Sequence, residues 1–272
     1  MYIGNLEASK VAFSAPYTKN HKTMVSVTFD DGRKLLFQIC EDFQKPASAK
    51  YGIDEVRDEG LSGERRGQTI VIRDPSGKAA LKALDEAIVK SAVANSKEWF
   101  GVKQPLSEEA VRLRYQPIVK EDEQPEQEGD MLMKFKVKVP PAKIPTKMIL
   151  PADKPGTYRE LLTEAELNDA VKMLENRGCL LAPIISVPLL WFMGGGTKFG
   201  ATLQAEEMVV TPAPPPSALR NFSSASSYEA VKRGAEEPVE ALAGDAKKVA
   251  TGEGEGPASD GEAGNSNLLA GA

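Results

Sequence analysis

The strongest constraint on the fold of this chain is the apolar run from Leu180 to Met193, which is followed by three consecutive glycines. The run has 14 residues and contains Pro183 and Pro188. A membrane-spanning helix needs about 20 apolar residues, and prolines inside a helix remove hydrogen bonds and cause clashes. The run therefore predicts a buried β-strand, whose prolines indicate bulges or irregular ends.

The residues after the glycines alternate as in a half-buried strand. Phe199, Ala201, Leu203 and Ala205 are separated by polar or small residues, which is the period of two that one buried strand face produces. A phosphate-binding loop would instead need Gly-Lys-Ser/Thr at the start of a helix. In this chain a threonine precedes the lysine, and a strand pattern follows. We therefore predict a strand, a turn at residues 194–196 and a second strand.

Upstream of this hairpin the chain shows both strand and helix patterns. β-Branched and aromatic residues predict strands at residues 10–16, at 24–40 with a turn at Asp31-Gly32, at 68–74 and at 131–139. Apolar spacing and capping residues predict helices at residues 77–98, from Ser107 onward, and at 163–178. Strands outnumber helices, so we expect a mainly β fold with helical insertions (α+β), as a barrel or sandwich.

The composition changes after residue 210. Residues 211–227 are rich in proline and serine, and residues 216–272 contain 5 Lys or Arg and 9 Asp or Glu. Such a polar segment buries too little apolar surface to offset the entropy of ordering it. We expect one folded domain over residues 1–210 and a disordered acidic tail over residues 211–272.

Catalytic residue types are scarce. His21 is the only histidine and lies in a polar turn, where we expect a solvated surface residue. Cys40 and Cys179 follow no secretory signal, so we expect reduced thiols in the core of an intracellular protein. Histidines, cysteines and carboxylates are not clustered at metal-ligand spacing. We therefore expect no enzyme, no catalytic residues, no cofactor and no metal.

The most informative charged stretch is "KFKVKVPPAKIPTK". On a strand, Lys134, Lys136 and Lys138 share one face, about 7 Å apart, which is close to the phosphate spacing of an extended single strand. Lys143 continues the basic run. The alternative is an ordinary solvent-facing strand whose lysines resist edge-to-edge aggregation.

Aromatic residues supply a second candidate feature. Proteins that bind single-stranded nucleic acid combine basic grooves with aromatic rings on which bases stack. Tyr17, Tyr51 and Trp191 are the aromatic residues with the weakest core pattern, and we take them as candidate stacking residues. The remaining aromatics with inward-facing or helix-end positions are expected in the core: Phe37, Phe135, Phe199, Trp99 and Phe100.

Four stretches together resemble a known family: "LLFQICEDFQKPASAKYGI", "ANSKEWFGVKQPLSEEAVRLRYQPIV", "MLMKFKVKV" and "LLAPIISVPLLWFMGGGTKFGATLQAEEM". The family is that of the single-stranded-DNA-binding-like proteins of large nucleocytoplasmic DNA viruses, which is similar to the short phage-type single-strand binders. The resemblance covers roughly residues 8–210. It implies an OB-fold-like β-barrel core with an acidic C-terminal tail.

The resemblance also implies a function. We expect non-enzymatic binding of single-stranded DNA in replication, recombination or repair, in the nucleus or at a viral replication site. The acidic tail would compete with DNA and dock replication proteins. No membrane association is expected, and a homodimer is left open. The alternative is a structural or interaction protein, such as a virion or scaffold component, that keeps the barrel without binding DNA.

Overall fold

The computed structural model describes residues 1–19, 21–41, 45–54, 65–140, 142–152, 154 and 157–212. The predicted disordered acidic tail lies outside these residues, except for its first two positions. Thr211 is the last residue of a strand, so the regular structure reaches the expected domain boundary.

The predicted hairpin is the spine of the fold. β12 (Leu180–Met193) and β13 (Lys198–Thr211) have 14 residues each and pair antiparallel. The turn between them, η3 (Gly194–Gly196), has positive φ at all three glycines, a conformation that side chains with a β-carbon disfavour. The register shifts twice along the pair, and Pro188 lies inside the second shift, as its position in the strand predicted.

Both strands of the hairpin carry shorter strands on their outer edges. β12 pairs antiparallel with β3 (Lys22–Phe29), β4 (Leu36–Gln38) and β5 (Ala47–Ser48). β13 pairs in parallel with β7 (Tyr115–Gln116), β9 (Met131–Lys138) and β10 (Lys147–Pro151).

The remaining strands attach to these and complete a 13-stranded sheet. β1 (Val11–Phe13) and β2 (Tyr17–Lys19) pair with β3, β6 (Arg65–Ile72) and β8 (Val119–Glu121) pair with β9, and β11 (Tyr158–Glu160) pairs with β10. Six short strands were not expected from the sequence, because segments of two to five residues carry no clear period. They lie at residues 17–19, 47–48, 115–116, 119–121, 147–151 and 158–160.

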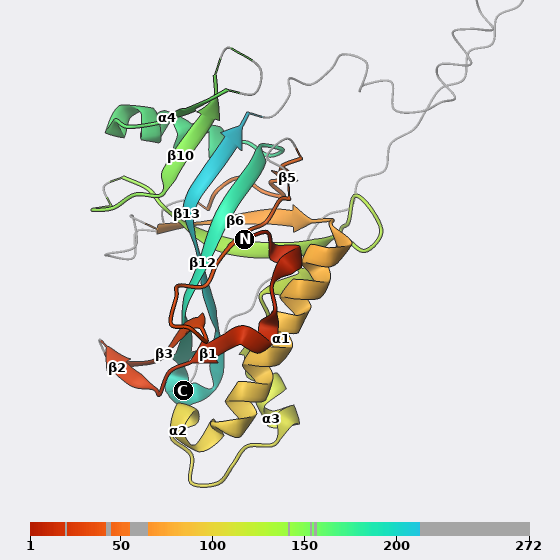
Figure 1. Ribbon diagram of the computed structural model, residues 1–272, viewed down its shortest axis with the longest axis vertical. Helices are drawn as coiled ribbons and strands as arrows, with labels where there is room; N and C mark the ends of the chain where they lie inside the picture. Colours follow the sequence, from red (N-terminus) through yellow and green to blue (C-terminus); the bar gives the residue numbers. More distant parts are fainter. Residues whose placement is uncertain are drawn as a thin grey trace, which may run out of the picture. The chain divides into compact units, whose positions relative to one another are not determined.

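The strand pairings run around a closed circuit. β12 pairs with β5, the segment after β5 bonds to β6, β6 pairs with β9, β9 with β13, and β13 with β12. The link between β5 and β6 consists of the Ala49–Ile70 bridge and a 3.0 Å hydrogen bond from Lys50 N to Thr69 O. Two of these links are single residue pairs, Ala49 with Ile70 and Lys136 with Gln204. The sheet is thus curled into a half-barrel rather than evenly closed, and β6 crosses the β12–β13 hairpin steeply (Figure 1). The mainly β fold class with helical insertions is confirmed.

The helices lie at the ends and side of this sheet (Figure 1). They are η1 (Ile3–Asn5), η2 (Ala8–Lys10), α1 (Pro75–Ala94), α2 (Ser96–Phe100), α3 (Glu108–Arg112) and α4 (Glu164–Leu174). The single helix expected over residues 77–98 is instead split at Asn95, which ends α1 and precedes α2. The capping box of Thr163 and Glu166 is confirmed at the start of α4.

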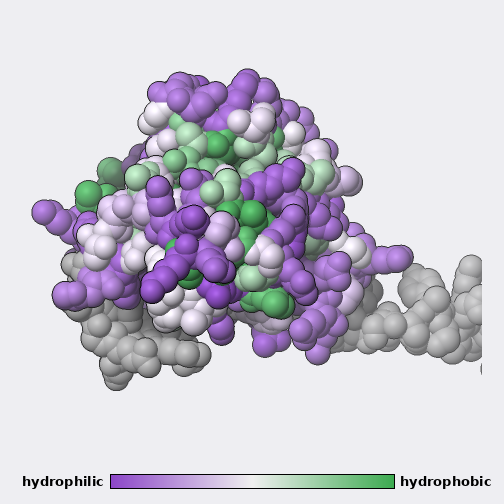
Figure 2. All heavy atoms as spheres, turned by 90° about the horizontal axis from the view of Figure 1, so that it is seen from below, coloured by the Kyte–Doolittle hydropathy of each residue, from purple (hydrophilic) through white to green (hydrophobic). Residues whose placement is uncertain are grey.

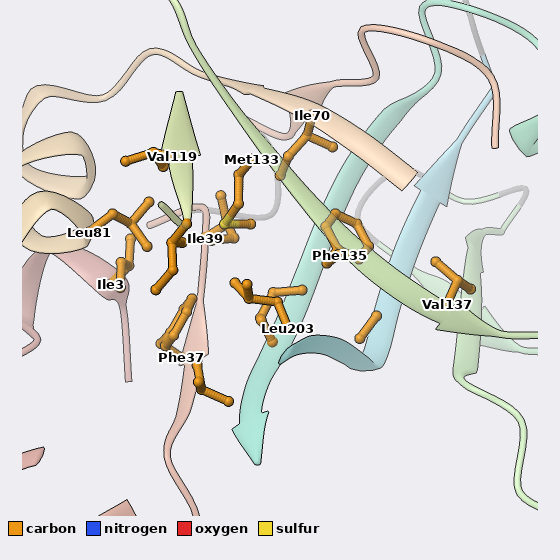
Figure 3. Packing of buried hydrophobic residues seen from close by; sticks show 14 of the residues in the cluster. Ile3, Phe37, Ile39, Ile70, Leu81, Val119, Met133, Phe135, Val137 and Leu203 are labelled. Atoms are coloured by element: carbon orange, nitrogen blue, oxygen red, sulfur yellow. The ribbon is translucent and has the colours of Figure 1, made fainter. Parts of the chain in front are cut away.

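The core fills the interior of the curled sheet and its contact with α1. Figure 3 shows Phe37 from β4, Met133 and Phe135 from β9, and Leu203 from β13 converging with Leu81 from α1. A second, purely aromatic part of the core joins α2 to the hairpin. The inward positions expected for Phe37, Phe135, Phe199, Trp99 and Phe100 are confirmed, since each is at most 6% exposed.

The strand pair expected around Asp31-Gly32 forms only in part. The turn is present, with Gly32 at φ +81°, and it is closed by Thr28 pairing with Lys34. Beyond that bridge β4 leaves β3 and pairs with β12. β3 and β4 thus follow one another along the same edge of β12, because the register shift in β12 separates their contacts.

The cysteines and the histidine lie where the sequence predicted them. Cys40 and Cys179 are both buried, and His21 is exposed in a turn with φ +59°. Seen from the end at which α2 and α3 lie, hydrophobic residues form small patches between hydrophilic ones (Figure 2). Among the described residues, no helix is both long and apolar enough to span a membrane.

Candidate nucleic-acid interface

The lysine row of β9 is placed by the alternation of that strand. Met133, Phe135 and Val137 are buried, while Lys134 and Lys136 are exposed and Lys138 is half-buried. Three ammonium groups therefore lie on the outer face of the sheet, as the sequence predicted. Lys143 is exposed in the connection between β9 and β10, outside this row.

The three lysines of the row have different neighbours. Lys134 Nζ forms a 2.6 Å ion pair with Asp54 Oδ2. Lys138 lies near Glu206. Burial raises the pKa of Glu206, but hydrogen bonds from Lys34 and Ser186 and the positive charge of Lys138 lower it, and the net pKa is below the ordinary value. Lys136 lies between Gly67 of β6 and Gln204 of β13, and no carboxylate of the described residues forms an ion pair with it.

A second row crosses the sheet through Trp191. Directly paired residues of neighbouring strands point to the same face. The successive pairings place five residues in line on one face: Tyr17, Met24, Trp191, Gly200 and Gln116. Tyr17 lies at one end of this row and is 39% exposed, and Trp191 is half-buried at its centre.

A cleft of about 760 Å³ opens where β9 diverges from β13. Three residues predicted from the sequence line it, namely Tyr51, Trp191 and Lys134. Lys120 from β8 and Lys198 from β13 also line it, as do Gln116 and Leu132. Two rings and three ammonium groups from distant parts of the chain therefore share one open cavity.

Tyr51 is held beside β6 by its neighbours in the chain. Lys50 N donates a 3.0 Å hydrogen bond to Thr69 O, and the Gln68 side-chain amide donates one of 2.9 Å to Tyr51 O. The tyrosine side chain is 43% exposed, and the Arg177 guanidinium lies over its ring, 5.9 Å from the centroid. The ring is therefore accessible, and it has a cation beside it.

Acidic residues line the same cleft. Glu121, Asp122 and Glu123 line it. Lys50, the neighbour of Tyr51, forms a 2.6 Å ion pair with Asp122. Only 12% of the Lys50 side chain and 2% of the Asp122 side chain are exposed. The pKa of Asp122 is lowered, chiefly by its close contact with the Lys50 ammonium group. These carboxylates would repel a phosphate chain, whereas the lysines of the same cleft would attract it.

This arrangement has the parts needed to hold a single strand. Bases can stack only if their faces are free, and every base has a π-face, so ring platforms accept unpaired nucleotides with little regard to sequence. Ammonium groups in the same cleft can neutralise phosphates, which position the strand.

The structure brings together part of the predicted site. Tyr51, Trp191 and Lys134 line the cleft, and Lys136 and Lys138 continue the strand that supplies Lys134. Tyr17 shares the face of Trp191 but does not line the cleft, and Lys143 lies in a loop.

Three cations near the cleft were missed by the sequence reasoning. Lys198 follows the glycine turn, where its local sequence indicates no phosphate-binding loop, and Lys120 belongs to a strand too short to show alternation. Arg177 follows α4, and only the folded chain brings it over Tyr51.

Comparisons with known proteins give distant structural neighbours. No protein-family model and no curated protein matches the chain. The structure of the single-stranded DNA-binding protein from bacteriophage Enc34 in complex with single-stranded DNA aligns at a TM-score of 0.40 and 12% identity, over 76% of this chain and 98% of that one. A C-terminal truncation of the same phage protein aligns at 0.39 and 14%, over 77% and 99%. At these values no residue role is transferred, and the function must be inferred from the surface of this chain.

Proposed function

We propose that this protein is a non-enzymatic single-stranded DNA-binding protein. The observation that carries the proposal is the cleft in which Tyr51 and Trp191 lie together with Lys120, Lys134 and Lys198. The accessible rings would receive bases, and the lysines would neutralise the adjacent phosphates.

Electrostatics support a local site on an otherwise acidic chain. The formal net charge of the protein is −5, which opposes nonspecific attraction to nucleic acid. Binding must therefore depend on the lysines of the cleft and on the row of β9. We expect affinity to fall steeply with salt, because neutralising phosphates releases the cations condensed on the strand.

The two tryptophans of the chain allow a direct test. Trp99 is 3% exposed within the aromatic core, whereas Trp191 lines the cleft. A base stacked on Trp191 should quench its fluorescence and leave Trp99 unaffected. The test titrates an unlabelled oligothymidine into the wild type, Trp99→Phe and Trp191→Phe at low salt.

The expected result is quenching in the wild type and in Trp99→Phe, and little change in Trp191→Phe. Fluorescence anisotropy of a labelled oligothymidine measures binding independently of the quenching. Absence of binding by anisotropy, even with residues 213–272 removed, would contradict the proposal and favour the structural or scaffold role.

We propose DNA replication, recombination or repair as the setting, in the nucleus or at a viral replication site. The support for this part is the resemblance of the sequence to the viral family. The acidic tail would dock replication proteins through Leu268 and Leu269, its last large apolar residues. A pull-down of replication proteins with a tail peptide, and with the same peptide carrying Leu268→Ala and Leu269→Ala, tests this role.

A further inference from the structure

One of the lysines that line the cleft, Lys134, forms an ion pair with Asp54. The two charged atoms are 2.6 Å apart, and the side chains are 47% and 53% exposed. Lys134 lines the cleft and belongs to the lysine row of β9. A carboxylate therefore lies where the phosphate of a bound strand would meet this ammonium group.

The position of Asp54 is fixed by its main chain. Asp54 N donates a 2.8 Å hydrogen bond to Gly67 O, and Arg66 Nε donates one of 2.6 Å to Asp54 O. The backbone is thus held along β6, while the carboxylate remains half-exposed. The side chain can leave Lys134 without any rearrangement of the sheet.

Gly67 makes room for the pair. It lies opposite Lys136 on the lysine face of β6 and β9. A β-carbon at this position would clash with both Asp54 Oδ2 and Lys134 Cε. The two side chains therefore meet directly over the glycine, which leaves the space that their contact occupies.

We propose that Asp54 is an intramolecular competitor for the phosphate that binds at Lys134. This inference rests on the proposed function, because it assigns a regulation to the same cleft. DNA binding exchanges the carboxylate for a phosphate at one ammonium group. Lys136 has no such competitor among the described residues, so the neighbouring cations Lys134 and Lys136 differ in their access to phosphate.

The size of the effect follows from the exposure of the pair. Exposed ion pairs contribute little to stability, so a phosphate can displace the carboxylate, and losing the competitor should raise DNA affinity about two- to five-fold at low salt. When DNA displaces the Asp54 carboxylate, that carboxylate attracts a cation from solution, which offsets one cation released from the DNA. In a variant without this carboxylate, the slope of log affinity against log salt should steepen by at most about 0.7.

The test compares Asp54→Asn with a matched control, Asp169→Asn. Asp169 forms a 2.9 Å ion pair with Lys172 within α4, and both side chains are exposed. Each substitution thus breaks one exposed Lys–Asp pair and changes the net charge equally. Affinity for a labelled oligothymidine is measured by anisotropy at two salt concentrations, and urea unfolding of each variant shows that the fold is retained.

The expected result is tighter binding by Asp54→Asn than by Asp169→Asn, with the gain lost when Lys134→Ala is added. Equal affinities of the two variants would overturn the inference and leave the proposed function intact. An equal gain from Asp54→Asn with or without Lys134 would also overturn it, because the effect would then be one of net charge. If no variant bound DNA, the proposed function would fail as well.

Discussion

The indole of Trp191 lies against Gly200, its partner on the neighbouring strand of the hairpin. A β-carbon at Gly200 would be 3.0 Å from Trp191 Cζ2 and 3.1 Å from Gln116 Cβ. These distances are too short for an undisturbed contact, so the glycine permits the ring to approach the sheet at this point.

Replacing Gly200 with alanine should therefore displace the indole. We expect Gly200→Ala to reduce the free energy of binding to single-stranded DNA by at most the contribution of one stacked base, about 1–3 kcal/mol. Anisotropy measures the affinity, and thermal unfolding shows whether the fold remains. Unchanged affinity with an unchanged quench of Trp191 would show that the ring position does not matter for binding.

Removing the ring of Tyr51 should weaken binding, whereas removing that of Tyr158 should not. Both tyrosines are 43% exposed, but only Tyr51 lines the cleft, while Tyr158 lies on β11. We expect Tyr51→Ala to cost about 1–3 kcal/mol of binding free energy. Equal losses in the two variants would argue against a stacking role for Tyr51.

The lysine row should contribute to the salt dependence of binding. If Lys134, Lys136 and Lys138 neutralise three phosphates, their replacement with alanine should reduce the slope of log affinity against log salt by about 2, at about 0.7 for each contact. Their side chains face solvent or are half-buried, so stability should change little.

A second triple variant controls for net charge. Lys90, Lys97 and Lys103 are exposed and do not line the cleft. Replacing them with alanine removes the same charge from another part of the surface. The same slope in both triple variants would show that the row on β9 only solvates its strand.

Asp85 should make the protein less stable as pH rises. Burial raises its pKa to about 6, although Tyr115 OH and Ile118 N donate hydrogen bonds to its carboxylate. The unfolded value is about 3.9, so the native state binds the extra proton between these two values. Stability should therefore fall as pH rises from about 4 to about 6, by about 3 kcal/mol in total.

The variant Asp85→Asn isolates this effect, because an amide oxygen still accepts the hydrogen bond from Tyr115. Urea unfolding at several pH values should show that the variant gains stability over the wild type as pH rises to about 6, and keeps a constant advantage above that value. Parallel stability profiles would mean that Asp85 does not titrate in this range.

Deleting the acidic segment should strengthen DNA binding. Residues 236–262 contain eight Asp or Glu and two Lys, and a tethered chain reaches its own body at an effective concentration of about millimolar. Truncation after residue 212 retains all of β13. We expect higher affinity at low salt and a smaller gain at high salt, where charges are screened. Identical affinities at low salt would leave the tail no inhibitory role.

Local patterns predicted the parts of the fold that depend on near neighbours. The alternation after the glycines identified β13, because Phe199, Leu203 and Ala205 lie two or four positions apart and are all buried. The capping box of Thr163 and Glu166 identified the start of α4, because its two residues are only three positions apart. The strand pattern also placed the three lysines of β9 on one face.

The parts that depend on distant pairing could not be predicted in this way. β7 has two residues and forms only because β13 offers it a free edge. The cleft likewise depends on where β9 leaves β13, which brings Tyr51 and Trp191 to one cavity from positions 140 residues apart in the chain. Lys134 and Asp54 are also far apart in the sequence, by 80 residues, and nothing in either local sequence indicates that they pair.

The central position of the β12–β13 hairpin has a consequence for the synthesis of the protein. β3, β4 and β5 all find their partner in β12, which begins at residue 180. During translation these strands leave the ribosome well before the strand that covers them, and contacts of such long sequence separation form slowly. Their free edges are then open to wrong pairing with other chains. The nascent chain therefore passes through a stage in which its own sheet does not yet cover these edges.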